Sequence, residues 1–227
     1  VLRTPYDPRL MFVSRLEAQP FSIRLIDIEG GKSHTLWQAE DGQGSGFYGL
    51  SSTEQLFWMS NNELIFPWEK EGWLHLYAIS STGGKAKLLT PGNFEIQYVS
   101  QSPDRSSLLF SSNQGDINRQ HIGQWKASKI TQITEGKGIE WSPVIDGLGN
   151  SFALGSSGLE PAAVKRLEKG QARAIFSSED YPSSHLTLPE AVVFSAADGM
   201  KIHGQLFLPK GLKPGQRNRA LLFFHGG

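Results

Sequence analysis

The sequence predicts a mainly β protein: a partial β-propeller of about four blades, followed by the first strands of an α/β domain. Two observations predict the propeller: strand-forming segments recur at a constant spacing, and turn-forming residues separate them. A third observation, a change of pattern near residue 182, predicts the second domain. We therefore expect propeller blades over residues 1–182 and a different domain over residues 183–227.

The repeat is clearest in one short apolar strand that occurs three times, at 64–66, 108–110 and 152–154. Phe66, Phe110 and Leu154 end these copies and recur at about 44 residues. A second strand follows at 74–79, 120–125 and 162–167, and a third at 87–90, 132–134 and 174–176. The third strand keeps the same spacing, which indicates one repeating unit.

An earlier copy of the unit is expected at 10–13, 23–28 and 35–37. It lies about ten residues too far upstream, and the Gly-rich stretch Asp41–Gly49 explains the excess as a loop. Because the segment 10–13 already resembles a folded strand, we expect the chain to begin inside a propeller whose first blades lie upstream. Pro103-Asp104 and Asp146-Gly147 are predicted to mark turns between units.

A unit of about 40 to 50 residues has the size of a four-stranded blade, which buries its faces against neighbouring blades. A closed ring of four blades is an open alternative, as is an antiparallel β-sandwich. A sandwich need not keep one spacing in two different strands, so the repeat favours the propeller.

The pattern changes after the last copy. Residues 181–189 contain two prolines and two serines with little periodicity, which is typical of a linker. Strand-forming residues then flank Asp198-Gly199, a pair that favours a hairpin turn. The run Ala220–Phe224 is continuously apolar, which predicts a strand buried on both faces. It ends at His225-Gly226-Gly227.

A buried strand that ends in His-Gly-Gly is typical of an oxyanion loop. Acyl transfer needs backbone N–H groups directed at a developing oxyanion, and glycines let the backbone approach closely. In α/β-hydrolases a loop at this place supplies one such donor. His225, Gly226 and Gly227 are therefore the candidate oxyanion-loop residues, although a strand that simply ends in a glycine turn is the alternative.

Taken together, these segments resemble the prolyl oligopeptidase family of serine peptidases, in particular its dipeptidyl peptidase IV-like branch. The resemblance covers nearly the whole chain, with the propeller part preceding the opening strands of an α/β-hydrolase domain. The residues that carry it are 71–77, 89–96 and 109–113 for the blades, and 194–209 with 221–227 for the hydrolase part.

The resemblance implies a longer parent protein that is a serine-type peptidase cleaving short peptides, with the propeller gating and selecting substrates. It implies no cofactor and a nucleophile in a downstream Gly-x-Ser-x-Gly turn, followed by Asp and His. The catalytic residues would then lie beyond Gly227, and this chain alone is expected to be inactive. His225 stands where some relatives have a tyrosine that helps to bind the oxyanion, so we assign the donor to the backbone.

Three functions are compatible with the sequence. The first is the substrate-selecting part of a peptidase, with a short peptide as partner and a homodimer of the parent left open. The second is a non-enzymatic propeller that binds a protein or peptide, and the third is a peptidase relative without its nucleophile. No adjacent Glu-Glu pair is present to bind a substrate amine as in the dipeptidyl branch, so dipeptide release, acyl-peptide cleavage and internal cleavage stay open.

Composition argues against other classes. Lys plus Arg and Asp plus Glu each number 22, so no net charge attracts nucleic acid or an anionic membrane. The chain has no cysteine and six isolated histidines, which predicts no metal site, and its localisation is undetermined. We interpret Glu40-Asp41, Glu69 with Glu71, and Glu179-Asp180 as solvated surface, and Trp58, Trp68, Trp73 and Trp141 as core.

Overall fold

The computed structural model describes residues 1–4, 20–168, 170–176, 178, 180–213, 215 and 217–224. The expected strand at 10–13 and the residues His225–Gly227 lie outside this part. The chain forms two compact units. One comprises Val1–Ser157 with Pro161–Glu179, and the other comprises Gly158–Glu160 with Asp180–Gly227.

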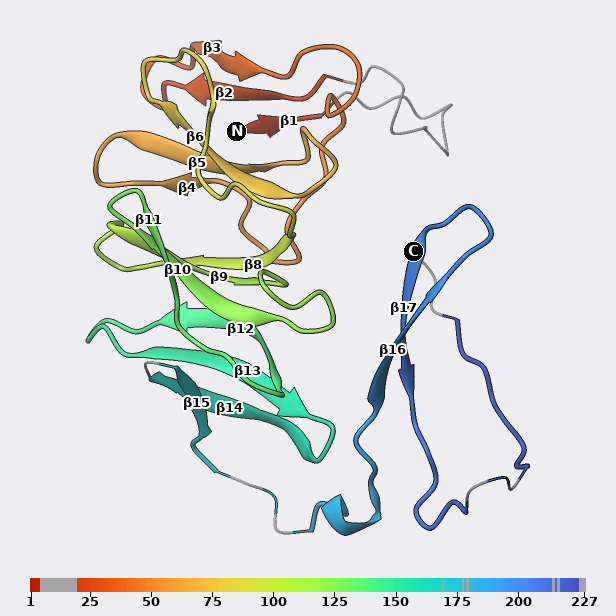
Figure 1. Cartoon of the computed structure of the whole chain (residues 1–227). Coiled ribbons are helices and arrows are strands. Elements are labelled where there is room, and N and C mark those ends of the chain that lie inside the picture. The colour runs from red at the N-terminus through yellow and green to blue at the C-terminus, as the bar shows by residue number, and fades with distance from the viewer. Residues whose placement is uncertain are drawn as a thin grey trace. The chain divides into compact units, whose positions relative to one another are not determined.

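The first unit consists of antiparallel sheets whose strands follow one another in chain order, and Figure 1 shows these sheets stacked as layers. A three-stranded sheet contains β1 (Leu2–Arg3), β2 (Ser22–Ile26) and β3 (Ser33–Gln38). The next contains β4 (Phe57–Trp58), β5 (Glu63–Trp68), β6 (His75–Ser80) and β7 (Lys87–Leu88). The third contains β8 (Ile96–Gln101), β9 (Ser107–Ser112), β10 (His121–Lys126) and β11 (Lys129–Gln132). The fourth contains β12 (Ile139–Ile145), β13 (Ser151–Ser157), β14 (Glu160–Glu168) and β15 (Gln171–Ala174).

The prediction of a mainly β chain is confirmed, and the succession of sheets is consistent with a partial propeller. In the described residues, the short 3-10 turn η1 (Ser183–His185) is the only helical element. None of them forms a helix with the length and apolar character needed to cross a bilayer. The number of blades stays a prediction.

Each sheet buries apolar side chains against its neighbours along the chain. Phe66 of β5 packs in a cluster with Ile23 of β2 and with Phe21, which precedes β2, whereas its neighbour Ile65 packs in a second cluster with Phe110. Because successive side chains of a strand point to opposite faces, one strand contributes to two layers of core. This explains why β5 is apolar without alternation, a pattern that the sequence shows as a short continuous run.

The predicted repeat is correct for two copies and shifted in the third. Phe66 and Phe110 are both fully buried, and Phe110 covers Gly123, where an added Cβ would lie 2.6 Å from the Phe110 ring. In β13, however, Ala153 packs against Leu109 and Ile122, so Leu154 points to the opposite face and is 36% exposed. Leu154 therefore shares the strand of the repeat but not its face.

The turns predicted between units lie within them instead. Pro103-Asp104 connects β8 to β9, and Asp146-Gly147 connects β12 to β13. The sequence repeat missed β8 and β12 because neither has simple apolar alternation. Both carry a register irregularity, between Ile96 and Val99 in β8 and between Trp141 and Val144 in β12.

The second unit contains the predicted hairpin, formed by β16 (Glu190–Ser195) and β17 (Lys201–Leu206). Its turn includes Gly199, whose φ of 87° favours glycine. The prediction of a buried strand at 220–224 is wrong for this structure. These residues form no strand, and Leu221 and Phe224 are 94% and 85% exposed, because the two-stranded hairpin provides no second layer to cover them.

The shift of the third copy can be tested by truncating side chains. Phe110→Ala is expected to lower the free energy of unfolding by about 3–5 kcal/mol, because it opens a cavity between two sheets. Leu154→Ala is expected to lower it by about 1 kcal/mol or less, because this side chain lies on the outer face. Urea denaturation measures both, and equal losses would contradict the assignment of Leu154 to the exposed face.

Candidate functional site

The predicted oxyanion-loop residues His225, Gly226 and Gly227 lie outside the described residues, so this assignment stays a prediction. The described part of the chain contains a buried polar cluster and a groove beside it. Both lie in the first unit, where the third and fourth sheets meet.

In two sheets a histidine begins the third strand and a threonine that follows the fourth strand lies near it. The Thr90 hydroxyl accepts a hydrogen bond from the backbone N–H of Leu76 at 3.0 Å and lies 3.3 Å from His75 Nδ1. His75 Nε2 donates to the Gly92 carbonyl at 3.0 Å, which leaves Nδ1 to accept from Thr90. The His75 ring also packs edge-on against Phe94 at 5.2 Å.

Burial lowers the pKa of His75 below its ordinary value. The hydrogen bond to Gly92 and the charge of Glu71 oppose this shift only in part. The neutral ring therefore fits the donor and acceptor pattern around it.

The second pair includes a carboxylate. The Thr134 hydroxyl accepts from the backbone N–H of Ile122 at 2.9 Å and donates to Glu140 Oε2 at 2.8 Å. The same Glu140 oxygen accepts from His121 Nδ1 at 2.9 Å. His121, Thr134 and Glu140 are all buried, and Glu140 comes from the neighbouring sheet. The cluster thus joins the third sheet to the fourth by hydrogen bonds between buried side chains.

Glu140 occupies the place that Ile96 has one sheet earlier. The backbone N–H of Ile96 donates to the Leu74 carbonyl, and that of Glu140 donates to the Gln120 carbonyl, in each case to the residue before the histidine. Isoleucine at this place is fully buried and needs no polar partner. Glu140 therefore stands where the preceding interface has an apolar side chain. Unlike isoleucine it needs hydrogen-bond partners, because an unpaired buried carboxylate is costly.

A buried lysine lies on the same sheet face. Gly155 pairs with Glu140 in the β12–β13 ladder, and a Cβ on Gly155 would lie 2.9 Å from Lys165 Cδ. The absence of a side chain at Gly155 thus makes room for the stem of Lys165. No group of three or more His, Asp or Glu side chains that could hold a metal ion occurs in the described residues.

A groove of about 480 Å³ opens beside this cluster. Gln120 and Ile139, the sequence neighbours of His121 and Glu140, form part of its lining. Its polar side includes Glu95 and Gln97, and its aromatic side includes Tyr98 and Trp141. The complete lining is Glu95, Gln97, Tyr98, Asn113, Ile117, Asn118, Arg119, Gln120, Ile139 and Trp141.

Hydrogen bonds fix the polar side of the groove. Gln120 Nε2 donates to Gln97 Oε1, and Gln97 Nε2 donates to Glu95 Oε1 at 3.2 Å. The backbone N–H of Glu95 donates to Asn113 Oδ1 at 2.7 Å. Residues from three separate segments thereby hold one another in place, which no local sequence pattern indicates.

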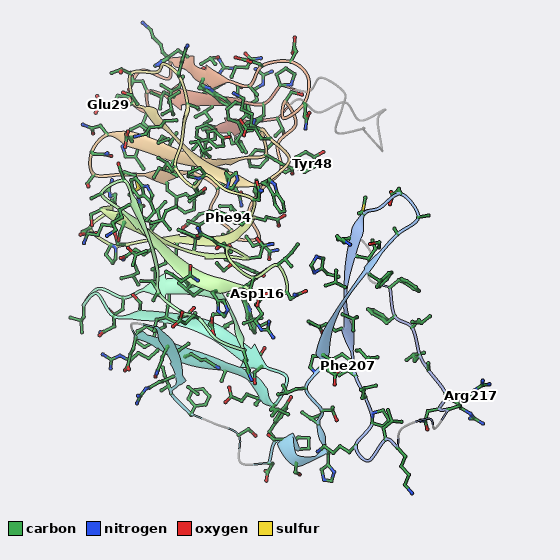
Figure 2. All side chains as sticks on the ribbon, viewed as in Figure 1. Glu29, Tyr48, Phe94, Asp116, Phe207 and Arg217 are labelled. Atoms are coloured by element: carbon green, nitrogen blue, oxygen red, sulfur yellow. The ribbon has the colours of Figure 1, made fainter. Side chains whose placement is uncertain are left out.

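Asp116 forms an ion pair with Arg119. Their Oδ2 and Nη1 atoms lie 2.7 Å apart, and Arg119 Nε donates to the Lys137 carbonyl at 3.3 Å. Burial raises the pKa of Asp116, but hydrogen bonds from Asn118 and Arg119 and the positive charges nearby leave it below its ordinary value. Figure 2 shows Asp116 in the loop between β9 and β10.

A second hollow, of about 360 Å³, lies at the turns that contain Asp104 and Asp146. Hydrogen bonds from Ser102 and Ser106 lower the pKa of Asp104 to about 2. A bond from the Asn150 side chain lowers that of Asp146. Each carboxylate accepts bonds from its own turn, so this hollow is explained by turn formation.

The four tryptophans predicted to lie in the core differ, and Trp73 is half-buried outside the core clusters of the described residues. Trp68 is buried among Trp37 and Tyr77, and Trp58 packs against the same cluster, so the prediction of core packing is confirmed for these two. Trp141 lines the groove instead. One sequence signal indicates the groove: residue 140 is charged, whereas residue 96, at the same position of the repeat, is apolar.

Most of the first unit matches a known protein family. Residues 9–162, more than half of the chain, match the family model of the dipeptidyl peptidase IV (DPP IV) N-terminal region. Dipeptidyl peptidase 4 from Porphyromonas gingivalis is 13% identical with a TM-score of 0.70, over 90% of this chain and 30% of that one.

Two further solved structures are similar. A puromycin hydrolase is 16% identical with a TM-score of 0.65, over 89% of this chain and 31% of that one. A puromycin-hydrolyzing peptidase from Mycobacterium tuberculosis is 16% identical with a TM-score of 0.64, over 85% and 30%. At these identities the likeness shows a shared fold, and the chain spans about a third of the length of the structures it matches.

The pKa of His75 predicts a pH dependence of stability. Because the folded state holds the neutral ring, the unfolded state takes up a proton first as the pH falls below 6.5. Stability is therefore expected to be complete above pH 6.5 and to decrease as the pH falls from there towards the lower pKa of the folded state. Unfolding measured between pH 7.5 and 5 should show a smaller decrease for His75→Gln, and parallel curves would contradict this origin.

Substitution at Glu140 tests the buried cluster. Glu140→Ala is expected to lower the free energy of unfolding by about 3–5 kcal/mol, because it leaves His121 and Thr134 without their partner and opens a cavity. Glu140→Ile introduces the residue of the neighbouring interface, which fills the space and lets Thr134 donate to His121 as Thr90 does to His75. We expect a smaller loss for Glu140→Ile in urea denaturation. A larger loss than for Glu140→Ala would refute the equivalence with Ile96.

Proposed function

Because this chain belongs to the family of the dipeptidyl peptidase IV N-terminal region, we propose that it is the propeller part of a peptidase that cleaves short peptides. The observation that carries the proposal is the family match over residues 9–162, which extends from the first sheet to the beginning of β14 in the fourth sheet. The solved structures with this fold support a hydrolase as the parent, since their names are those of peptidases and hydrolases.

In this proposal the parent carries its catalytic residues outside this chain. A hydrolase domain begins after residue 182, with the β16–β17 hairpin as its first strands. The backbone of Gly226 and Gly227 donates to the oxyanion, and a serine downstream acts as the nucleophile. Removal of dipeptides from a free N-terminus is the finer proposal, for which the family name is the support.

The stacked sheets have a selecting role in this proposal. Apolar cores between neighbouring sheets hold the sheets in place, so the loops at the sheet ends form a surface that restricts which peptides reach the catalytic residues. The mixed polar and aromatic groove between β8 and β12 supports peptide binding, because amide, aromatic and charged groups recognise a peptide together. The same groove would serve a non-enzymatic peptide-binding propeller.

The two functions differ in covalent chemistry. The longer protein that contains this chain is expected to react with a fluorophosphonate probe and to release a fluorophore from short peptide substrates. Replacing the serine of its Gly-x-Ser-x-Gly turn by alanine should abolish both signals, and residues 1–227 alone should give neither.

Peptide length provides the second measurement. If the sheets restrict access, kcat/KM should decrease steeply for folded proteins relative to peptides of a few residues. A longer protein without the serine turn and without labelling would instead support the binding module. Labelling together with equal cleavage of large and small substrates would remove the selecting role.

A further inference from the structure

We propose that the groove between β8 and β12 binds a cationic group, an ammonium or a guanidinium carried on a side chain of a peptide. The inference rests on the proposed function only for the peptide nature of the ligand. Its preference for a cation follows from the residues of the groove, which combine one carboxylate, two aromatic rings and a neutralised arginine.

Glu95 supplies the negative charge. Its Oε1 accepts from Gln97, its backbone N–H is held by Asn113, and it is half-buried. Within the described residues, no lysine or arginine forms an ion pair with Glu95. The carboxylate is thus held in position by neutral amides, which orient it without cancelling its charge.

Arg119 does not make the groove attractive to anions. Asp116 binds its guanidinium at 2.7 Å, and the lowered pKa of Asp116 keeps this carboxylate ionised near neutral pH. The Arg119–Asp116 pair is therefore neutral as a whole, and Glu95 leaves one unbalanced negative charge. An incoming carboxylate would be repelled by Glu95, whereas an ammonium or guanidinium would be attracted.

Two aromatic rings and two apolar side chains complete the site. Tyr98 and Trp141 are half-buried, and their faces attract cations as well as carbon chains. Ile117 and Ile139 are 56% and 37% exposed and offer apolar surface to the methylene stem of a lysine or arginine side chain. A carbon stem with a charged end therefore matches the lining better than a wholly apolar or anionic group.

The backbone around the two rings is irregular, which directs them. Tyr98 lies within the register shift of β8, and Trp141 precedes Ser142, whose φ of 48° is unusual for serine. Such bulges redirect side chains and are frequent beside binding sites. Beneath the groove, His121 and Glu140 pair with each other, so the lining residues Gln120 and Ile139 are fixed from below.

Binding to blocked peptides tests the proposal. The probes are N-acetylated, C-amidated tripeptides with lysine or arginine between two alanines, and their neutral counterparts contain norleucine or citrulline. Because both termini are blocked, only the central side chain carries charge. Calorimetric titration of the chain is expected to show about tenfold tighter binding of each cationic peptide than of its neutral counterpart.

The variants assign this preference to the groove. Glu95→Gln keeps an amide acceptor for Gln97 but removes the charge, and Trp141→Leu removes a ring; each should reduce the preference by about threefold or more. Glu54→Gln, at an exposed glutamate outside the groove, should leave it unchanged. Thermal unfolding of all variants confirms that they fold.

Three results would overturn the inference: equal binding of lysine and norleucine peptides, a lysine preference that persists in Glu95→Gln, or tighter binding of a glutamate peptide. None of them depends on hydrolysis, because binding is measured directly. A longer protein that cleaves peptides without a cationic preference would leave the proposed function intact and remove this inference alone. If the chain binds cationic peptides but the longer protein does not react with the fluorophosphonate probe, this inference stands and the proposed peptidase function is lost.

Discussion

The fold depends on burial of sheets on both faces. Phe66 and Ile65 are adjacent in one strand, yet they pack in different clusters on opposite sides of their sheet. Each burial of a large side chain contributes about 1.5–3 kcal/mol, so a sheet with a neighbour on each face gains stability from both sides. The groove depends on the same constraint, because its residues come from two sheets that are held at a fixed separation by their shared core.

The interface between the third and fourth sheets departs from this apolar rule. It has Glu140, Thr134 and His121. The preceding interface has Ile96, Thr90 and His75 at the corresponding places. Apolar packing also holds two sheets together, as at the neighbouring interface, where Ile96 is fully buried. A polar cluster adds directional bonds that fix one alignment of the sheets, and this alignment sets the distance between the residues that line the groove.

The sequence predicted the strands that are densely apolar and missed those that are not. The copies ending at Phe66 and Phe110 were placed correctly, because their residues must fill two cores. β8 and β12 were not predicted, because bulges interrupt their alternation of apolar and polar residues. In β12, Pro143 also argues against a strand. The groove could not be predicted, since Glu95, Arg119 and Trp141 are joined only by tertiary packing, and the apolar run at 220–224 has no layer to pack on in this structure.

The order of strands within each sheet has a consequence for synthesis of the protein. Among the described residues, each strand of the first unit pairs with the strands that come directly before or after it in chain order. Ribosomes deliver the chain from its N-terminus, and each layer can close as soon as its own strands have emerged. The newly closed layer then serves as the template on which the next one condenses, and the exposed apolar face advances along the nascent chain one layer at a time.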